Sequence, residues 1–298
     1  YLADLATQKI VALHPDTGKP KWSVDLDCLP TDLAVSPDGA KVYASCLTSD
    51  EVVVVDAASE LVTHRIPTAA KPARLVAMPN RALLLAGSKH ENKLSLIDTT
   101  QNLKFAVVEL PGRPAVMAPR VKQPVVYLSD GDSGKVYEVE LRGNRLLRTL
   151  NEKGDKDFLK QVTALAVQEE DDGLGRLWLV SRAEHRVQAV DLFTQKVLLN
   201  EEVGKKPLQI AMGPAEEHRL YVLCGEGDRI EVFDTLAMTR LEPIQLPSNS
   251  FPSDFTVDGE GRYAYVTTAG DEQLYVVDLK SGQLASAYSP QVRGIGLL

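Results

Sequence analysis

Four polar residues occupy the same place in four short apolar runs of this 298-residue chain. Each stands two residues after a proline that opens its run; they are Asp32, Arg74, Gln209 and Asp254. Arg293 lies beside Gly294, which holds the equivalent place near the end of the chain. Carboxylate, guanidinium and amide groups that converge in space bind a polar ligand or a cation. The alternative is that these side chains hold water and pair with one another.

A polar insertion over residues 151–161 lengthens one segment of the chain. Long loops on a rigid scaffold are often functional, and this one carries Asp155, Phe158 and Leu159. These three residues are candidates for contact with a partner protein. The alternative is a surface loop anchored by one aromatic side chain.

Motifs for other chemistry are missing from the sequence. There is no Gly-x-Ser-x-Gly elbow, no glycine-rich phosphate loop and no His-Glu-x-x-His pair. The five histidines are scattered, and Cys28, Cys46 and Cys224 lack metal-ligand spacing. We therefore expect no catalytic residue, no metal and no cofactor. A Cys28–Cys46 disulfide is conceivable, and the alternative is that these cysteines are small buried side chains.

Composition narrows the classes of partner. The chain is 44% hydrophobic and 25% charged, as in ordinary globular proteins, with a formal net charge of −8. An acidic balance argues against nucleic acid, because lysine and arginine supply most of that affinity. No apolar run approaches the ~18 residues that a membrane-spanning helix needs. The chain starts at Tyr1 rather than methionine, so we expect a mature or trimmed product.

The elements that must position these residues form a repeat. A run such as Val52-Val-Val-Val-Asp56 recurs, most often with a carboxylate at its end, at intervals of 42, 42, 42, 51, 43 and 44 residues. The residues that end these runs are His14, Asp56, Asp98, Glu140, Asp191, Asp234 and Asp278. An aspartate here accepts from backbone N–H groups two or three residues on and starts a turn.

Three more short runs accompany each of these runs. Every repeat therefore predicts four β-strands, which we letter A to D from the inside outward. Four strands in about 42 residues are typical of a β-propeller blade. We predict an all-β, seven-bladed propeller forming a single domain over residues 1–298. The segment Val292–Leu298 is expected to supply strand A of the first blade and to close the ring. The B–C and D–A loops share one end of each blade, and the A–B and C–D turns share the other.

The repeat resembles a known family. Pro30 to Ser45, with Ser-Pro-Asp-Gly inside it, and the run Tyr265-Val-Thr-Thr268 look like the YVTN-repeat propellers. The fourth position lacks asparagine in every blade, so the chain resembles a divergent member. The resemblance implies a bacterial or archaeal, exported protein, periplasmic or secreted, that acts by binding.

Two functions follow as hypotheses. The first is a non-catalytic binding or scaffold propeller that holds another protein or a small polar ligand at the B–C and D–A loops, as a monomer or as a subunit of a complex. The alternative is an enzyme with an axial polar or metal site at Asp32 and Asp254, either a lactonase-like hydrolase or the propeller subunit of an oxidoreductase. From the sequence we favour the first hypothesis, a non-catalytic binding propeller, over an enzyme.

Overall fold

The computed structural model describes residues 1–15, 17–150, 158–169, 175–289 and 294–297. These residues are almost all in strands and tight turns, and their one helical element is a 3₁₀ turn, η1 (Ala215–Glu217). In the described part of the chain, no helix is long and apolar enough to cross a membrane.

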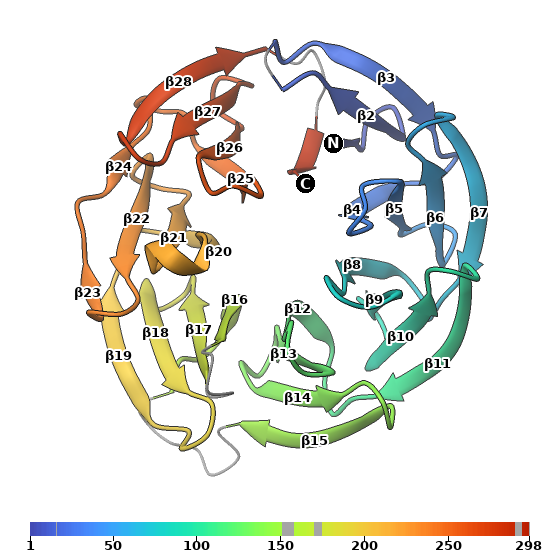
Figure 1. Ribbon diagram of the computed structural model, residues 1–298, viewed down its shortest axis with the longest axis horizontal. Helices are drawn as coiled ribbons and strands as arrows, with labels where there is room; N and C mark the ends of the chain where they lie inside the picture. Colours follow the sequence, from blue (N-terminus) through green and yellow to red (C-terminus); the bar gives the residue numbers. More distant parts are fainter. Residues whose placement is uncertain (16, 151–157, 170–174, 290–293, 298) are drawn as a thin grey trace. The chain divides into compact units, whose positions relative to one another are not determined.

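The chain folds into two compact units, unit 1 mainly from residues 1–149 and unit 2 mainly from residues 150–291. Unit 1 holds four sheets, in the strand orders β29-β1-β2-β3, β4-β5-β6-β7, β8-β9-β10-β11 and β12-β13-β14-β15. Unit 2 holds three, in the orders β16-β17-β18-β19, β20-β21-β22-β23 and β25-β26-β27-β28 (Figure 1). The single domain expected for residues 1–298 stays a prediction.

The strands of unit 1 are β1 (Leu2–Asp4), β2 (Lys9–Leu13), β3 (Pro20–Asp25), β4 (Pro30–Val35), β5 (Lys41–Cys46), β6 (Glu51–Asp56), β7 (Leu61–Pro67), β8 (Pro72–Ala77), β9 (Leu83–Ser88), β10 (Lys93–Asp98), β11 (Leu103–Glu109), β12 (Pro114–Pro119), β13 (Val125–Asp130), β14 (Val136–Glu140), β15 (Arg145–Leu150) and β29 (Gly294–Leu297). The strands of unit 2 are β16 (Val162–Glu169), β17 (Gly175–Ser181), β18 (Arg186–Asp191), β19 (Val197–Glu202), β20 (Pro207–Met212), β21 (Arg219–Cys224), β22 (Arg229–Asp234), β23 (Thr239–Arg240), β24 (Ile244–Gln245), β25 (Pro252–Val257), β26 (Tyr263–Thr268), β27 (Leu274–Asp278) and β28 (Gln283–Tyr288).

Each sheet has four strands, or five in the β20 sheet, and the strand pairs whose register is described are antiparallel, so the predicted seven-bladed β-propeller fold is confirmed. In the β20 sheet the outer strand is interrupted, so that β23 and β24 each pair with β22. The predicted C-terminal strand is also confirmed, because β29 takes the inner place beside β1 in the first sheet.

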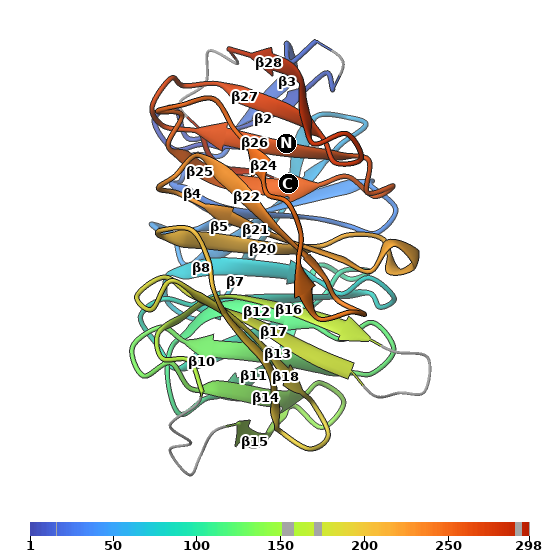
Figure 2. The ribbon, with the colours of Figure 1, turned by 90° about the vertical axis from the view of Figure 1, so that its left-hand side faces the viewer.

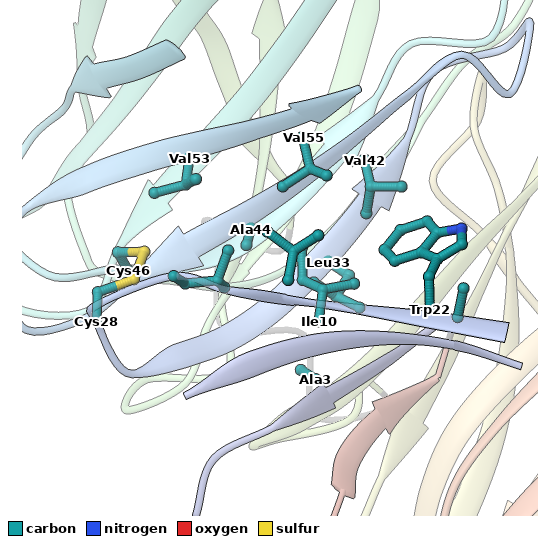
Figure 3. Close-up of a cluster of buried hydrophobic side chains, with 13 residues drawn as sticks. Ala3, Ile10, Trp22, Cys28, Leu33, Val42, Ala44, Cys46, Val53 and Val55 are labelled. Atoms are coloured by element: carbon teal, nitrogen blue, oxygen red, sulfur yellow. A yellow bond between two sulfur atoms is a disulfide. The ribbon is translucent and has the colours of Figure 1, made fainter. Parts of the chain in front are cut away.

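The core lies between successive blades. In unit 1, Trp22 and Ile10 of the first sheet pack against Val42 and Val55 of the second (Figure 3). In unit 2 a corresponding cluster fills the space between the β20 and β25 sheets, which Figure 2 shows one above the other. A strand buried on both faces is apolar throughout, and this explains the run of four valines in β6, all with no exposed area.

Carboxylates at the ends of the third strands fold the C–D turns as predicted. Asp56 Oδ1 accepts from the backbone N–H of Ser59 at 2.7 Å, and Asp278 Oδ1 does the same with Ser281 at 2.7 Å. These backbone hydrogen bonds are the main reason that the pKa values of Asp56 and Asp278 lie below their ordinary range.

Candidate functional site

The inner strands of six blades, from β4 to β25, each carry a β-bulge just before the place where the polar residues were predicted to line an axial site. The register of β4 shifts between Pro30 and Asp32, and that of β20 between Pro207 and Gln209. The same shift occurs in β8, β12, β16 and β25. A bulge leaves a backbone group outside the ladder, and a nearby side chain must then satisfy it.

In unit 1 the side chains that bond these backbone groups link successive sheets. The half-buried carboxylate of Asp32 accepts from the N–H of Leu33 at 3.1 Å and from the N–H of Leu75 in β8 at 2.9 Å. Arg74 is exposed, and its Nε donates to the carbonyl oxygen of Ala115 in β12 at 3.2 Å. Each predicted site residue therefore holds its own blade to the next.

Unit 2 uses the same device. Gln209 Oε1 accepts from the N–H of Phe255 in β25 at 3.2 Å. Asp254, which is only 9% exposed, accepts from the same N–H at 2.9 Å. The two predicted residues thus meet at one backbone amide.

The structure brings the predicted residues together on neighbouring inner strands, Asp32 with Arg74 in unit 1 and Gln209 with Asp254 in unit 2. Arg293 lies outside the described residues. The contacts described between sheets are structural, and the binding of a ligand by these side chains stays a prediction.

Each blade has one end that carries its B–C and D–A loops, and we call these ends of the blades the loop ends. Side chains from the B–C hairpins hold the loops there in place. Asp50, at φ 55°, accepts from the backbone N–H of Lys71 at 2.7 Å. His185, at φ 54°, accepts through Nδ1 from the N–H of Lys206 at 3.2 Å. Such contacts fix the D–A loops against the hairpins, so the loop ends present rigid backbone.

One exposed aromatic at a loop end was not predicted from the sequence. Phe251 is 51% exposed and lies in the left-handed region, at φ 45°, which bulky residues seldom adopt. Asp228 holds it there by accepting from its N–H at 3.0 Å and from that of Asn249 at 2.7 Å. The signal in the sequence is its place directly before Pro252, the proline that opens strand β25. Backbone strain of this kind persists where the surroundings enforce it.

The residues predicted for the long D–A loop are divided by the structure. Asp155 lies outside the described residues. Phe158 and Leu159 are 5% and 2% exposed, and the N–H of Leu159 donates to Gln188 Oε1 at 3.3 Å. The two apolar side chains therefore anchor the end of the loop in unit 2. The contact of this loop with a partner stays a prediction.

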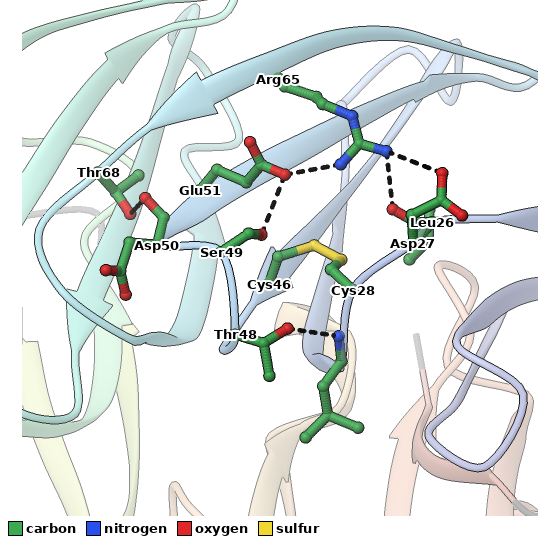
Figure 4. A network of polar contacts seen from close by, with 11 residues as sticks. Leu26, Asp27, Cys28, Cys46, Thr48, Ser49, Asp50, Glu51, Arg65 and Thr68 are labelled. Carbon is green, nitrogen blue, oxygen red and sulfur yellow. Dashed lines mark hydrogen bonds and ion pairs between the residues drawn. A yellow bond between two sulfur atoms is a disulfide. The ribbon is translucent and has the colours of Figure 1, made fainter.

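The disulfide that the sequence left open is formed. Cys28 in the D–A loop is bonded to Cys46 at the end of β5, with their Cα atoms 5.5 Å apart. Arg65 lies nearby, paired with Glu51 at 2.6 Å and donating to the carbonyl oxygen of Leu26 at 2.8 Å (Figure 4). Cys224 is buried and unbonded, and burial raises the pKa of its thiol to about 12, so it is unreactive at neutral pH.

Metal ligands are not clustered in the part of the chain that the structure describes, where no group of three His, Cys, Asp or Glu side chains is placed to hold an ion. Whether the protein binds a metal or a cofactor is not decided by this, and the expected absence of both stays a prediction.

Comparisons with known proteins support the fold. No family model and no curated protein matches the sequence. A solved chain of Kuenenia stuttgartiensis hydrazine synthase is similar with a TM-score of 0.69 at 16% identity, covering 88% of this chain and 81% of that one. The chain has the β-propeller fold.

Two further propellers are similar over most of this one. A functionally unknown protein from Desulfotomaculum acetoxidans DSM 771 has a TM-score of 0.81 at 11% identity, covering 99% of this chain and 96% of that one. The dihydro-heme d1 dehydrogenase NirN, in complex with DHE, has a TM-score of 0.68 at 13% identity, covering 96% and 72%. Identities this low establish the fold and nothing about activity.

Proposed function

We propose that this propeller is a non-catalytic binding module that holds a protein partner, or a small polar ligand, at its loop ends. The observation that carries the proposal is the pairing of Asp228 with Phe251. Asp228 fixes the backbone of Phe251 in the left-handed region, as Asp50 does for Lys71, so that here an exposed aromatic residue stands on a fixed backbone. Exposed, rigid aromatics are typical anchors of protein interfaces, because they bury a large area at little cost in conformational entropy.

Asp32 has a structural role that requires no catalysis. Both of its oxygens accept from backbone amides, one of them in the neighbouring blade. The residues predicted from the sequence for an axial site, Asp32, Arg74, Gln209, Asp254 and Arg293, are kept in this proposal as candidates for binding a small polar ligand.

An exported location fits the same proposal. Disulfides persist mainly in oxidising compartments, and the Cys28–Cys46 bond would be formed there. Membership of the YVTN-repeat family, which the motif at Tyr265 suggests, is part of this proposal.

The test is affinity capture from an extract of the source cells with matched variants. Phe251→Ser removes the aromatic at a loop end, whereas Phe193→Ser removes one that is 78% exposed in a C–D turn at the other end of its blade. We expect one stoichiometric partner, identified by mass spectrometry, with the wild type and Phe193→Ser and its loss with Phe251→Ser. Capture by all three alike, or by none, would count against the proposal.

The enzyme alternative is compatible with the likeness to chains named for hydrazine synthase and for a dehydrogenase, which by itself establishes only the fold. On that reading the chain is an oxidoreductase subunit or a lactonase-like hydrolase with Asp32 and Asp254 at an axial site. Elemental analysis and an absorption spectrum of the protein purified from its source would decide. A stoichiometric ion or chromophore, lost in Asp32→Asn or Asp254→Asn, would favour the enzyme.

A further inference from the structure

A cavity opens at the other end of the blades of unit 1, away from the loop ends. It has a volume of ≈ 580 Å³, within the usual range for small-molecule sites. Its walls come from the first two sheets: the start of β1 and the β2–β3 turn on one side, the β4–β5 and β6–β7 turns on the other. None of the residues predicted from the sequence for binding lies in it.

The floor of this cavity is aromatic. The rings of Tyr1 and Trp22 lie 5.5 Å apart between centroids and are tilted by 47°. Trp22 is only 8% exposed and is fixed by its packing against the core between the two sheets (Figure 3). Small residues, Gly39, Ala40 and Ala57 among them, line the same cavity and take up little of its volume. The floor therefore suits a flat, apolar group of the size of one aromatic ring.

The two walls carry opposite charges, those of Lys21 and Asp38. His14 and Lys21 line the wall of the first sheet, and Asp38 lines that of the second. Within the described ranges, the imidazole of His14 and the ammonium of Lys21 have no hydrogen-bond or ion-pair partner. Donors on one wall are thus available to a ligand.

Asp38 is preorganised for a cation. Its Oδ1 accepts from Ser36 Oγ at 2.5 Å and from the N–H of Ala40 at 3.0 Å. The hydrogen bond from Ser36 is the main cause that lowers the pKa of Asp38, so the side chain is ionised at neutral pH. These bonds engage Oδ1 and hold the carboxylate beside the cavity that Asp38 lines.

We propose that this cavity binds an aromatic zwitterion, such as a free aromatic amino acid. The ring would lie on Trp22, the carboxylate would face Lys21 and His14, and the ammonium would face Asp38. A ligand with one charge would meet a like charge on one of the walls, and a neutral sugar would use neither charge.

The probe is L-phenylalanine, followed by titration calorimetry and by tryptophan fluorescence excited at a wavelength that phenylalanine does not absorb. Trp22 lines the cavity, whereas Trp178 is fully buried in unit 2, so a fluorescence change reports on the cavity. We expect saturable binding, and weaker binding of 3-phenylpropanoate and of phenethylamine, which each lack one charge. A charged hydrogen bond lost in this way weakens binding about tenfold or more.

Variants separate this site from a general surface effect. Asp38→Asn keeps an oxygen for Ser36 and Ala40 while removing the charge, and Lys21→Met removes the ammonium. Both should weaken L-phenylalanine about tenfold, while Lys19→Met, on the same turn but outside the cavity lining, should not. The proposal is overturned if phenylalanine does not bind, if the three variants bind it as the wild type does, if 3-phenylpropanoate binds as tightly, or if glucose binds in its place.

Discussion

Cys28 and Cys46, which are 18 positions apart in the sequence, tie the D–A loop that enters the second blade to the inner pair of strands of that blade. The same two places are joined differently elsewhere. Ser88 Oγ donates to the carbonyl oxygen of Ala70, and Ser181 Oγ donates to that of Lys160 at 2.6 Å. The disulfide thus replaces, in one blade, a hydrogen bond that other blades use to hold the incoming loop.

Removal of this disulfide should destabilise the protein. The chain-entropy model gives about 3 kcal/mol for a loop of this length, so Cys28→Ala with Cys46→Ala should lower the free energy of unfolding in urea by about that much. Thiol titration of the unfolded wild type should find one thiol before reduction and three after. Cys224→Ala is the control for the loss of a buried cysteine. Three thiols without reductant would contradict the bond.

A second disulfide should form at the equivalent place in unit 2. The N–H of Gly225 donates to the carbonyl oxygen of Lys206 at 2.9 Å, as that of Leu47 donates to Leu29 at 3.0 Å beside the native bond. Lys205 therefore corresponds to Cys28 and Cys224 to Cys46. Lys205→Cys should leave no titratable thiol in the unfolded, unreduced protein and raise its stability by up to about 3 kcal/mol. Lys206→Cys, one residue away, should keep its thiols, and equal oxidation of both variants would refute the correspondence.

The bridge made by Asp32 should contribute measurably to stability. Asp32→Ala leaves the amides of Leu33 and Leu75 without this acceptor, and each unsatisfied buried group costs about 1–3 kcal/mol. We expect a loss of about 2–4 kcal/mol in urea unfolding, and a smaller loss for Asp32→Asn, whose amide oxygen still accepts.

Asp25→Ala serves as the comparison for Asp32, because its side chain is 70% exposed in an ion pair with Lys9. Surface pairs contribute about 0–1 kcal/mol. If Asp32→Ala is no more destabilising than Asp25→Ala, the linking role assigned to Asp32 is wrong.

The C–D turn aspartates should make the protein sensitive to acid. The pKa values of Asp56, Asp191, Asp234 and Asp278 are lowered, chiefly by backbone N–H donors, and that of Asp98 chiefly by Thr100. A lowered folded-state pKa gives stability that is present above the unfolded value, 3.8, and is lost as the pH falls through the folded value. Urea midpoints should therefore be level near neutral pH and fall below about pH 4. Asp278→Asn should make that fall less steep, and an unchanged slope would contradict the assignment.

Much of the fold was predictable because the repeat carries it. The carboxylate at Asp56 and its equivalents, and the proline before each inner strand, are local turn and strand signals that need no long-range contact to be interpreted. The bulge after Pro30 was not predictable, since the register of a strand depends on its partner. From the sequence alone, Asp32 is predicted to bind a ligand. The bulge shows that Asp32 also links two sheets.

The candidate sites were predicted less completely for the same reason. Phe158 was a candidate either for contact with a partner or for anchoring its loop, and it is buried, whereas Phe251 was not predicted although it is exposed. Neither residue type nor spacing gives the direction of a side chain in an irregular loop. The cavity beside Trp22 is built from three turns and the start of β1, and only the packing of two sheets shows that they leave a space.

Cross-linking of the protein to its partner in the source cells, with lysine-reactive reagents and mass spectrometry, tests the proposed binding at the loop ends most directly. Exposed lysines are present at both ends of the blades. The B–C and D–A loops carry Lys71, Lys89 and Lys206, and the C–D turns at the opposite end carry Lys19 and Lys280. We predict that cross-links to a partner concentrate at Lys71, Lys89 and Lys206 and disappear with Phe251→Ser. Cross-links concentrated at Lys19 and Lys280, or the same pattern with Phe251→Ser, would contradict it.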